Sequence, residues 1–243
     1  MGAAADKNNV ILVRADGTAL TFSTFLGSSG LETAFGVEVD ANDNVFVVGV
    51  TQSSAFPTTG NALQKDLQGP SDMFLMKFDG AATLQVSTLF GGNREDEPFR
   101  MAIDRQGSVY VVGTTGSTGI RPVDAVQPAN GGGRDLFLLK VSNALDTVQM
   151  FTYLGGAADD TGLSMALDAN GRIILSGRAI STDLLTTGNA RQKTLAGGTD
   201  AILAVIDTSG SMHGLPEQVA KAVVLEALRT AHSEKRRCYL YAY

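Results

Sequence analysis

Three oxygen-bearing side chains near the C-terminal end have the types and spacing of a metal site. Asp207, Ser209 and Ser211 alternate in the run DTSGSM and offer one carboxylate and two hydroxyl groups. Hard oxygen ligands of this kind suit Mg²⁺, and water fills the positions that the protein leaves open. Since Asp207 supplies the only charge, we expect a weak, partial site for Mg²⁺ or Mn²⁺ at these three residues.

A column of acids is the second candidate for chemistry. Glu32, Asp96 and Asp160 recur at a spacing of 64 residues. They could line one rim of the fold and bind cations or a basic partner. Acidic side chains in loops more often accept hydrogen bonds from nearby backbone amides. We expect this second, structural role for the column.

No set of residues provides an acid, a base and a nucleophile together, so we expect no catalysis. His213 and His232 are the only histidines, and neither has another metal ligand at a suitable spacing. The run Gly210–Gly214 carries its Ser in the second place and is not a nucleophile elbow. The run DANDN at 40–44 lacks the Gly and Glu of a calcium loop, which predicts a hairpin turn.

The strands and turns around these residues follow from one pattern that repeats along the chain. Leu26, Phe90 and Leu154 each precede a Gly, and they step by 64 residues. The same step relates Gly49, Gly113 and Gly177, then Asp40, Asp104 and Asp168, and the apolar set Phe56, Ile120 and Leu184. A fixed period in this range is typical of arrays whose units bury their surfaces against each other.

Each repeat predicts four short strands. In one repeat they cover 72–79, 83–91, 98–104 and 108–115, which are apolar runs separated by Asp, Gly, Asn and Ser. Hairpin turns are expected near Asn42–Asn44, Gln106–Gly107 and Asn170–Gly171. Four antiparallel strands per repeat are typical of a propeller blade. We therefore predict three blades with boundaries near residues 7, 71, 134 and 199.

The motifs LGGAADDTG, DANGRIILSG and FPTTGNALQ resemble those of the SBBP bacterial beta-propeller repeats. The resemblance covers about residues 7–200, in repeats 7–70, 71–133 and 134–198. It implies a scaffold or binding surface and no shared chemistry. Because propellers contain about 4 to 8 blades, three blades predict an open arc that self-associates.

The fourth copy of the pattern changes after its first strand. The run ILAVI before Asp207 is apolar throughout, which predicts a strand buried on both faces. The next segment is apolar at helical spacing and predicts a helix followed by a strand. The stripe consists of Val219, Ala222, Val223, Ala227 and Ala231, with Glu226 and Thr230 on the same side.

Residues 199–243 resemble the first part of a von Willebrand factor A domain of the type associated with MoxR AAA ATPases. Asp207, Ser209 and Ser211 match part of that family's metal ion-dependent adhesion site. The resemblance implies Mg²⁺ and an acidic side chain from a protein partner, of which a MoxR-type ATPase is the family's example. The family's remaining Thr and Asp ligands come from later loops, so the site is half built.

Composition narrows the class of protein. A hydrophobic content of 44% suits a globular chain, and a net charge of −6 argues against a nucleic-acid partner. Cys238 is the single cysteine and cannot form an internal disulfide. No signal peptide or membrane span is apparent, which predicts a cytoplasmic chain, although the repeats suggest an extracytoplasmic origin.

We therefore expect a mainly β fold of three four-stranded propeller-type blades, followed by a short β-α-β fragment of a von Willebrand A-like α/β fold. Three functions remain open. The chain is a non-catalytic interaction scaffold with a partial adhesion site, a purely structural repeat fragment with a capping helix, or a hydrolase or lyase that uses the acidic column. The junction of two families also leaves open a gene fusion, a truncation or an artificial sequence.

Overall fold

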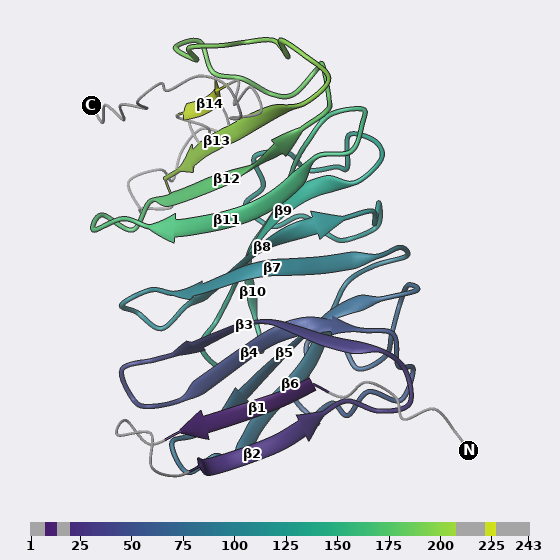
Figure 1. The fold of residues 1–243 in the computed structure, drawn as a ribbon, viewed down its shortest axis with the longest axis vertical. Coiled ribbons are helices and arrows are strands. Elements are labelled where there is room, and N and C mark those ends of the chain that lie inside the picture. The colour runs from purple at the N-terminus through teal and green to yellow at the C-terminus, as the bar shows by residue number, and fades with distance from the viewer. Residues whose placement is uncertain (1–7, 14–19, 208–221, 227–243) are drawn as a thin grey trace.

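The described part of the chain is built from strands and loops alone. The computed structural model describes residues 8–13, 20–207 and 222–226, and in these ranges it contains fourteen strands and no helix (Figure 1). The strands form one two-stranded and three four-stranded antiparallel sheets. This is the mainly β, open, propeller-like fold that the repeat predicts.

The strands follow chain order within each sheet. The two-stranded sheet pairs β1 (Asn8–Val13) with β2 (Leu20–Leu26). The first four-stranded sheet contains β3 (Glu32–Val39), β4 (Val45–Thr51), β5 (Asp72–Phe78) and β6 (Leu84–Phe90). The second contains β7 (Asp96–Ile103), β8 (Val109–Thr115), β9 (Asp135–Val141) and β10 (Val148–Leu154). The third contains β11 (Thr161–Leu167), β12 (Ile173–Ala179), β13 (Asp200–Ile206) and β14 (Ala222–Glu226).

The sheets are displaced from the sequence repeats by half a unit. Strands β3 and β4 belong to repeat 7–70, whereas β5 and β6, in the same sheet, belong to repeat 71–133. The chain crosses to the next sheet in the short linker after β6, at the Gly91-Gly92 pair, and not near residue 71. The boundaries predicted near residues 71, 134 and 199 therefore fall inside sheets, because the long connection after β4, β8 or β12 leads to a strand that pairs with that same strand.

Repeated aspartates close the hairpin between the first two strands of each full sheet. Asp104 Oδ1 accepts hydrogen bonds from the amides of Gln106 at 2.9 Å and Ser108 at 2.8 Å, and Gly107 takes a positive φ of 84°. This turn chemistry is local and was predictable from the Asp, Asn and Gly cluster. Asp40 and Asp168 make the equivalent pairs of bonds.

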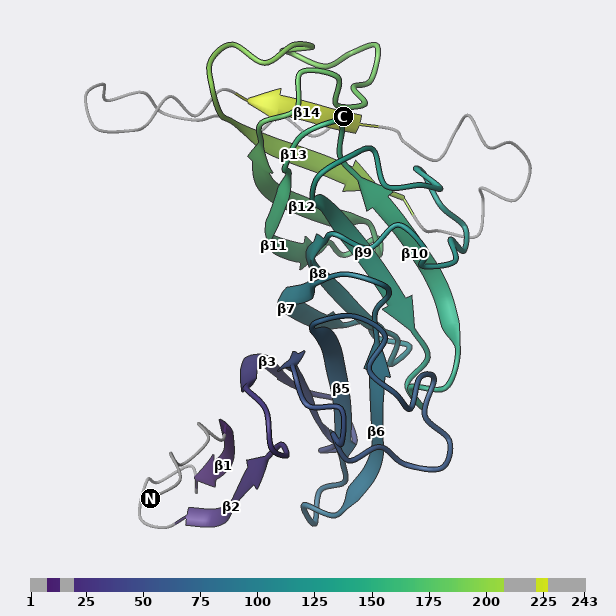
Figure 2. The same ribbon diagram turned by 90° about the vertical axis from the view of Figure 1, so that its right-hand side faces the viewer.

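The sheets stack face to face, and the apolar core lies between them. Strand β7 packs against β3 on one side and β11 on the other, so the first strand of every full sheet lies along one edge of the stack (Figure 2). Three clusters of buried apolar side chains fill the successive junctions. The β1–β2 sheet and the third full sheet lie at opposite ends of the stack (Figure 1).

Two expectations about the last repeat are corrected. Ala222–Glu226 forms β14, which pairs antiparallel with β13, instead of the middle of a helix. The outer edge of β13 needs hydrogen-bond partners, and a short run containing two adjacent valines suits a strand. The rest of the predicted helix lies outside the described residues. Strand β13 alternates between buried and half-buried residues, since no further described sheet covers its second face.

The described residues contain no helix that is long and apolar enough to cross a membrane.

Candidate functional site

The structure describes one of the three predicted metal ligands. Asp207 directly follows β13 and is half-buried. Ser209 and Ser211 lie outside the described residues, so the geometry of the three oxygen ligands stays a prediction. Among the residues that the structure describes, no group of three or more His, Cys, Asp or Glu side chains could hold a metal ion.

The acidic column predicted from the repeat holds loops against the inner strands. Asp96 Oδ2 accepts hydrogen bonds from the amide of Gly92 at 2.7 Å and from the hydroxyl of Ser117 at 2.9 Å. Its Oδ1 accepts one from the hydroxyl of Thr115. The structural interpretation of the column is therefore confirmed. Glu32 is buried and accepts from one amide and two hydroxyl groups in the same way, whereas buried Asp160 accepts from backbone amides.

A second buried acidic column was missed by sequence reasoning. Asp135, the first residue of β9, accepts hydrogen bonds from Gln127 Nε2 at 3.1 Å and from the amide of Gly131 at 2.8 Å. A Gln–Asp spacing of eight residues recurs in each repeat and was the signal that could have revealed this pairing. The equivalent pairs are Gln64 with Asp72 and Gln192 with Asp200.

The two columns meet on either side of Gly91. A Cβ at this position would lie 2.7 Å from Asp72 Oδ1 and 2.7 Å from Asp96 Oδ2, so only Gly fits between the two carboxyl groups. Burial raises the pKa of Asp96 to about 6; hydrogen bonds oppose this shift and the charge of Asp72 adds to it. Burial likewise raises the pKa of Asp72.

These raised pKa values do not create an acid–base site. Asp72 and Asp96 have no exposed surface, so a substrate cannot reach either carboxyl group. Perturbed carboxyl groups also occur in structural networks, and access to a cleft is what distinguishes a catalytic group. The geometry assigns both to the framework that joins adjacent sheets.

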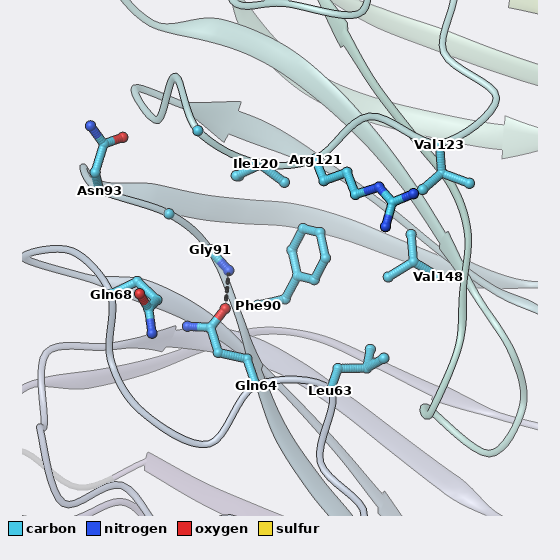
Figure 3. Close-up of a pocket in the computed structure, with 12 residues that line it drawn as sticks. Leu63, Gln64, Gln68, Phe90, Gly91, Asn93, Ile120, Arg121, Val123 and Val148 are labelled. Atoms are coloured by element: carbon cyan, nitrogen blue, oxygen red, sulfur yellow. Dashed lines mark hydrogen bonds between the residues drawn. The ribbon is translucent and has the colours of Figure 1, made fainter.

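An open pocket of about 650 Å³ lies next to this framework, at the junction of the first two full sheets (Figure 3). Its wall is mostly apolar, and Arg121 is its only charged residue. Figure 3 shows Arg121 on the same side as the Phe90 ring, Val123 and Val148, with Gln68 and Asn93 at the other side. The lining residues are Leu63, Gln64, Gln68, Phe90, Gly91, Gly92, Asn93, Gly119, Ile120, Arg121, Val123 and Val148.

The first full sheet leaves an apolar face uncovered. Val37 and Val39 on β3 are 61% and 55% exposed. Their repeat equivalents on β7 are Met101, which is 6% exposed, and Ile103, which packs against a buried cluster. The difference has a direct cause: β3 packs against β7, whereas among the described residues no strands corresponding to β3 and β4 join the two-stranded sheet and cover β3.

Comparison with known proteins supports the repeat. The family model for the SBBP beta-propeller repeat matches residues 85–121, which include β7, β8 and most of β6. The match does not extend into residues 199–243. No curated protein matches the chain.

Among solved structures, a protein of unknown function from Bacteroides caccae is 9% identical, over 90% of this chain and 75% of that chain, with a TM-score of 0.29.

Proposed function

We propose that the chain is a non-catalytic protein-interaction scaffold that accepts a β-hairpin from another polypeptide beside its two-stranded sheet. The observation that carries the proposal is the contrast between exposed Val37 and buried Met101 at equivalent positions. An uncovered apolar face of this kind marks an interaction surface.

Backbone pairing supports the same location. Strand β1 corresponds to β5, β9 and β13 in the repeat, and each of those strands has a neighbour on both edges. Within the described ranges, β1 pairs with β2 alone. An unpaired edge offers a row of backbone donors and acceptors to an added strand, and side-chain pockets then select its sequence. The occupant that fits is an antiparallel hairpin like β7–β8.

The proposal includes the statement that the chain catalyses no reaction. It is supported by the use of the buried acids: Asp96 and Asp135 are occupied by loop amides and hydroxyl or amide side chains and have no exposed surface.

Supplying the missing hairpin in the same chain tests the proposal. A second copy of residues 96–133 joined directly to Asn8 would lead into β1 as the chain leads from β8 into β9. Light scattering after size-exclusion chromatography should show self-association of the parent chain and a monomer for the extended chain. An extension of the same length made of Gly and Ser should leave self-association unchanged.

Val37→Lys combined with Val39→Lys should also give a monomer, because charged residues on an exposed face block strand addition. Leu163→Lys with Leu185→Lys is the matched control, since these residues are 50% and 49% exposed on other parts of the surface. A compact, protease-resistant monomer of the parent chain would contradict the proposal, as would loss of association in the control.

A partial metal site with a protein partner is the second candidate. It rests on the oxygen ligands of Asp207, Ser209 and Ser211 and on the resemblance to von Willebrand A domains that work with MoxR-type AAA ATPases. Strand β14 weighs against it, because that family has a helix where Ala222–Glu226 pairs with β13. Metal titration decides between the two candidates.

A further inference from the structure

The pocket between the first and second full sheets combines an apolar wall with hydrogen-bond donors that no other described residue uses. Arg121 forms no ion pair or hydrogen bond with any described residue, and the side-chain amide of Gln68 has no partner there either. Asn93 uses its Oδ1 to accept from the amide of Thr118 at 3.1 Å, which leaves its Nδ2 group available. All three side chains are exposed at the pocket.

The framework beneath the pocket is already satisfied. Gln64 Oε1 accepts from the amide of Gly91 at 3.0 Å, and its Nε2 donates to Asp72. Gly92 donates to Asp96 at 2.7 Å. The nearby carboxylates are therefore held behind the wall, and no acidic residue lines the pocket itself. An anionic group entering the pocket meets Arg121 without a competing carboxylate.

The chain contains its own comparison at the next junction. The framework recurs there, since Gly155 donates to Gln127 Oε1 at 3.0 Å, as Gly91 does to Gln64. The free donors do not recur, because the repeat places residues without such groups at their positions. Gln68, Asn93 and Arg121 correspond to Gly131, Ala157 and Leu185. A junction therefore forms without these donors, so the fold of the repeat does not require them.

We propose that this pocket binds an organic carboxylate with an apolar body. Arg121 pairs with the carboxylate, because its planar guanidinium matches two carboxylate oxygens. Phe90, Val123 and Val148 contact the apolar body, and Gln68 with Asn93 donates to a second acceptor. A volume of about 650 Å³ lies within the usual range for small-molecule pockets.

The inference is independent of the proposed hairpin site, since the two share no residue. Calorimetric titration with 3-phenylpropionate and with its neutral amide, 3-phenylpropionamide, tests it on the full chain. The acid should bind at least about tenfold more tightly than the amide, as expected for one charge-assisted bidentate pair. N-acetyl-glycyl-phenylalanine, as acid and as amide, then distinguishes a small acid from the C-terminus of a peptide as the source of the carboxylate.

Variants taken from the next junction make the test specific. Arg121→Leu should bind acid and amide equally, because it removes the only charge in the pocket. Asn93→Ala should weaken the acid and the amide of N-acetyl-glycyl-phenylalanine about equally, by a few-fold, because it removes a donor to the second acceptor without changing the charge. Both substitutions use the residue that the chain itself places at the equivalent position, so the fold should be retained, and thermal unfolding checks this. Arg121→Gln gives a second neutral variant.

Equal affinity of the parent chain for acid and amide, or no binding of either at millimolar concentration, would overturn the proposal. So would a preference for the acid that persists in both neutral Arg121 variants.

Discussion

Gln127 and Asp135 lie eight residues apart and are joined by a hydrogen bond of 3.1 Å from Nε2 to Oδ2. The same glutamine accepts a bond of 3.0 Å from the amide of Gly155, so one side chain connects the start of β9 to the linker between two sheets. The pair recurs in every described repeat and links the connection inside a sheet to the crossing between sheets.

Gln127→Ala should lower the free energy of unfolding by about 2 kcal/mol, because it removes one of the two hydrogen bonds to a buried carboxyl group and leaves the amide of Gly155 without its partner. Asp135 would keep only the hydrogen bond from the amide of Gly131, since its Oδ1 already lacks a hydrogen bond within the described residues. Urea denaturation measures the change. Gln85→Ala is the matched control, since its bond to Asp79 is exposed, and it should change stability by less than about 0.5 kcal/mol. Equal effects of the two substitutions would refute the assigned role.

Gly113→Ala should destabilise the chain by roughly 3 kcal/mol, the upper part of the range for overpacked cores. A Cβ at Gly113 would lie 2.1 Å from the carbonyl oxygen of Glu97 and 2.7 Å from the Phe137 ring. The crowding arises because Gly113 pairs with Pro98, next to the bulge in β7. Gly60→Ala is the control, since no atom lies within 4 Å of its added Cβ. Thermal unfolding with a similar loss in both variants would show that the close approach is not the cause.

Stability should fall as the pH rises from about 4 to 6, through the contribution of Asp96. Its pKa is raised from 3.8 to about 6 in the folded chain, so the folded state binds the proton more tightly than the unfolded chain. The stabilisation is present below the unfolded pKa and is lost as the pH passes the folded one. At about 1.4 kcal/mol per pKa unit, the loss is at most roughly 3 kcal/mol.

Asp96→Asn removes this dependence. The difference in unfolding free energy between the parent chain and the variant should therefore shift in favour of the variant between pH 4.5 and pH 7.5. Asp66→Asn, at an exposed position, serves as the control. A difference that stays constant across this window would show that Asp96 titrates normally in the folded chain.

Mg²⁺ or Mn²⁺ should bind weakly at Asp207, Ser209 and Ser211 if these residues adopt the adhesion-site geometry. Asp207→Ala should abolish binding because it removes the only charged ligand, whereas Ser209→Ala should only weaken it. Isothermal titration of the three proteins, with and without an added carboxylate peptide, measures the effect. Identical traces for the parent chain and Asp207→Ala would mean that the sequence motif holds no metal.

The turns and strands that depend on local chemistry could be predicted from the sequence alone. The strand runs are separated by turns that Asp104 and Gly107 close through bonds within five residues, so their positions could be predicted from composition and spacing. The period of 64 residues likewise predicted a stack of equivalent four-stranded units. The structural role of Asp96 followed from the same reasoning, because an acid before a strand usually accepts loop amides.

The division of the repeats into sheets depends on pairing between strands of different repeats. A periodic sequence has no unique starting point, so β4 could have ended one sheet or continued into β5, and pairing between them settled the choice. Segment Ala222–Glu226 carries apolar residues that suit a helix or a strand, and the edge of β13 selected the strand.

The pocket was beyond sequence reasoning for the same reason. Its lining runs from Leu63 to Val148, and these residues meet only because the chain crosses between sheets at Gly91. Sequence spacing determines local hydrogen bonds, whereas contacts between distant residues depend on which faces bury each other, and that is settled by the packing of the whole stack.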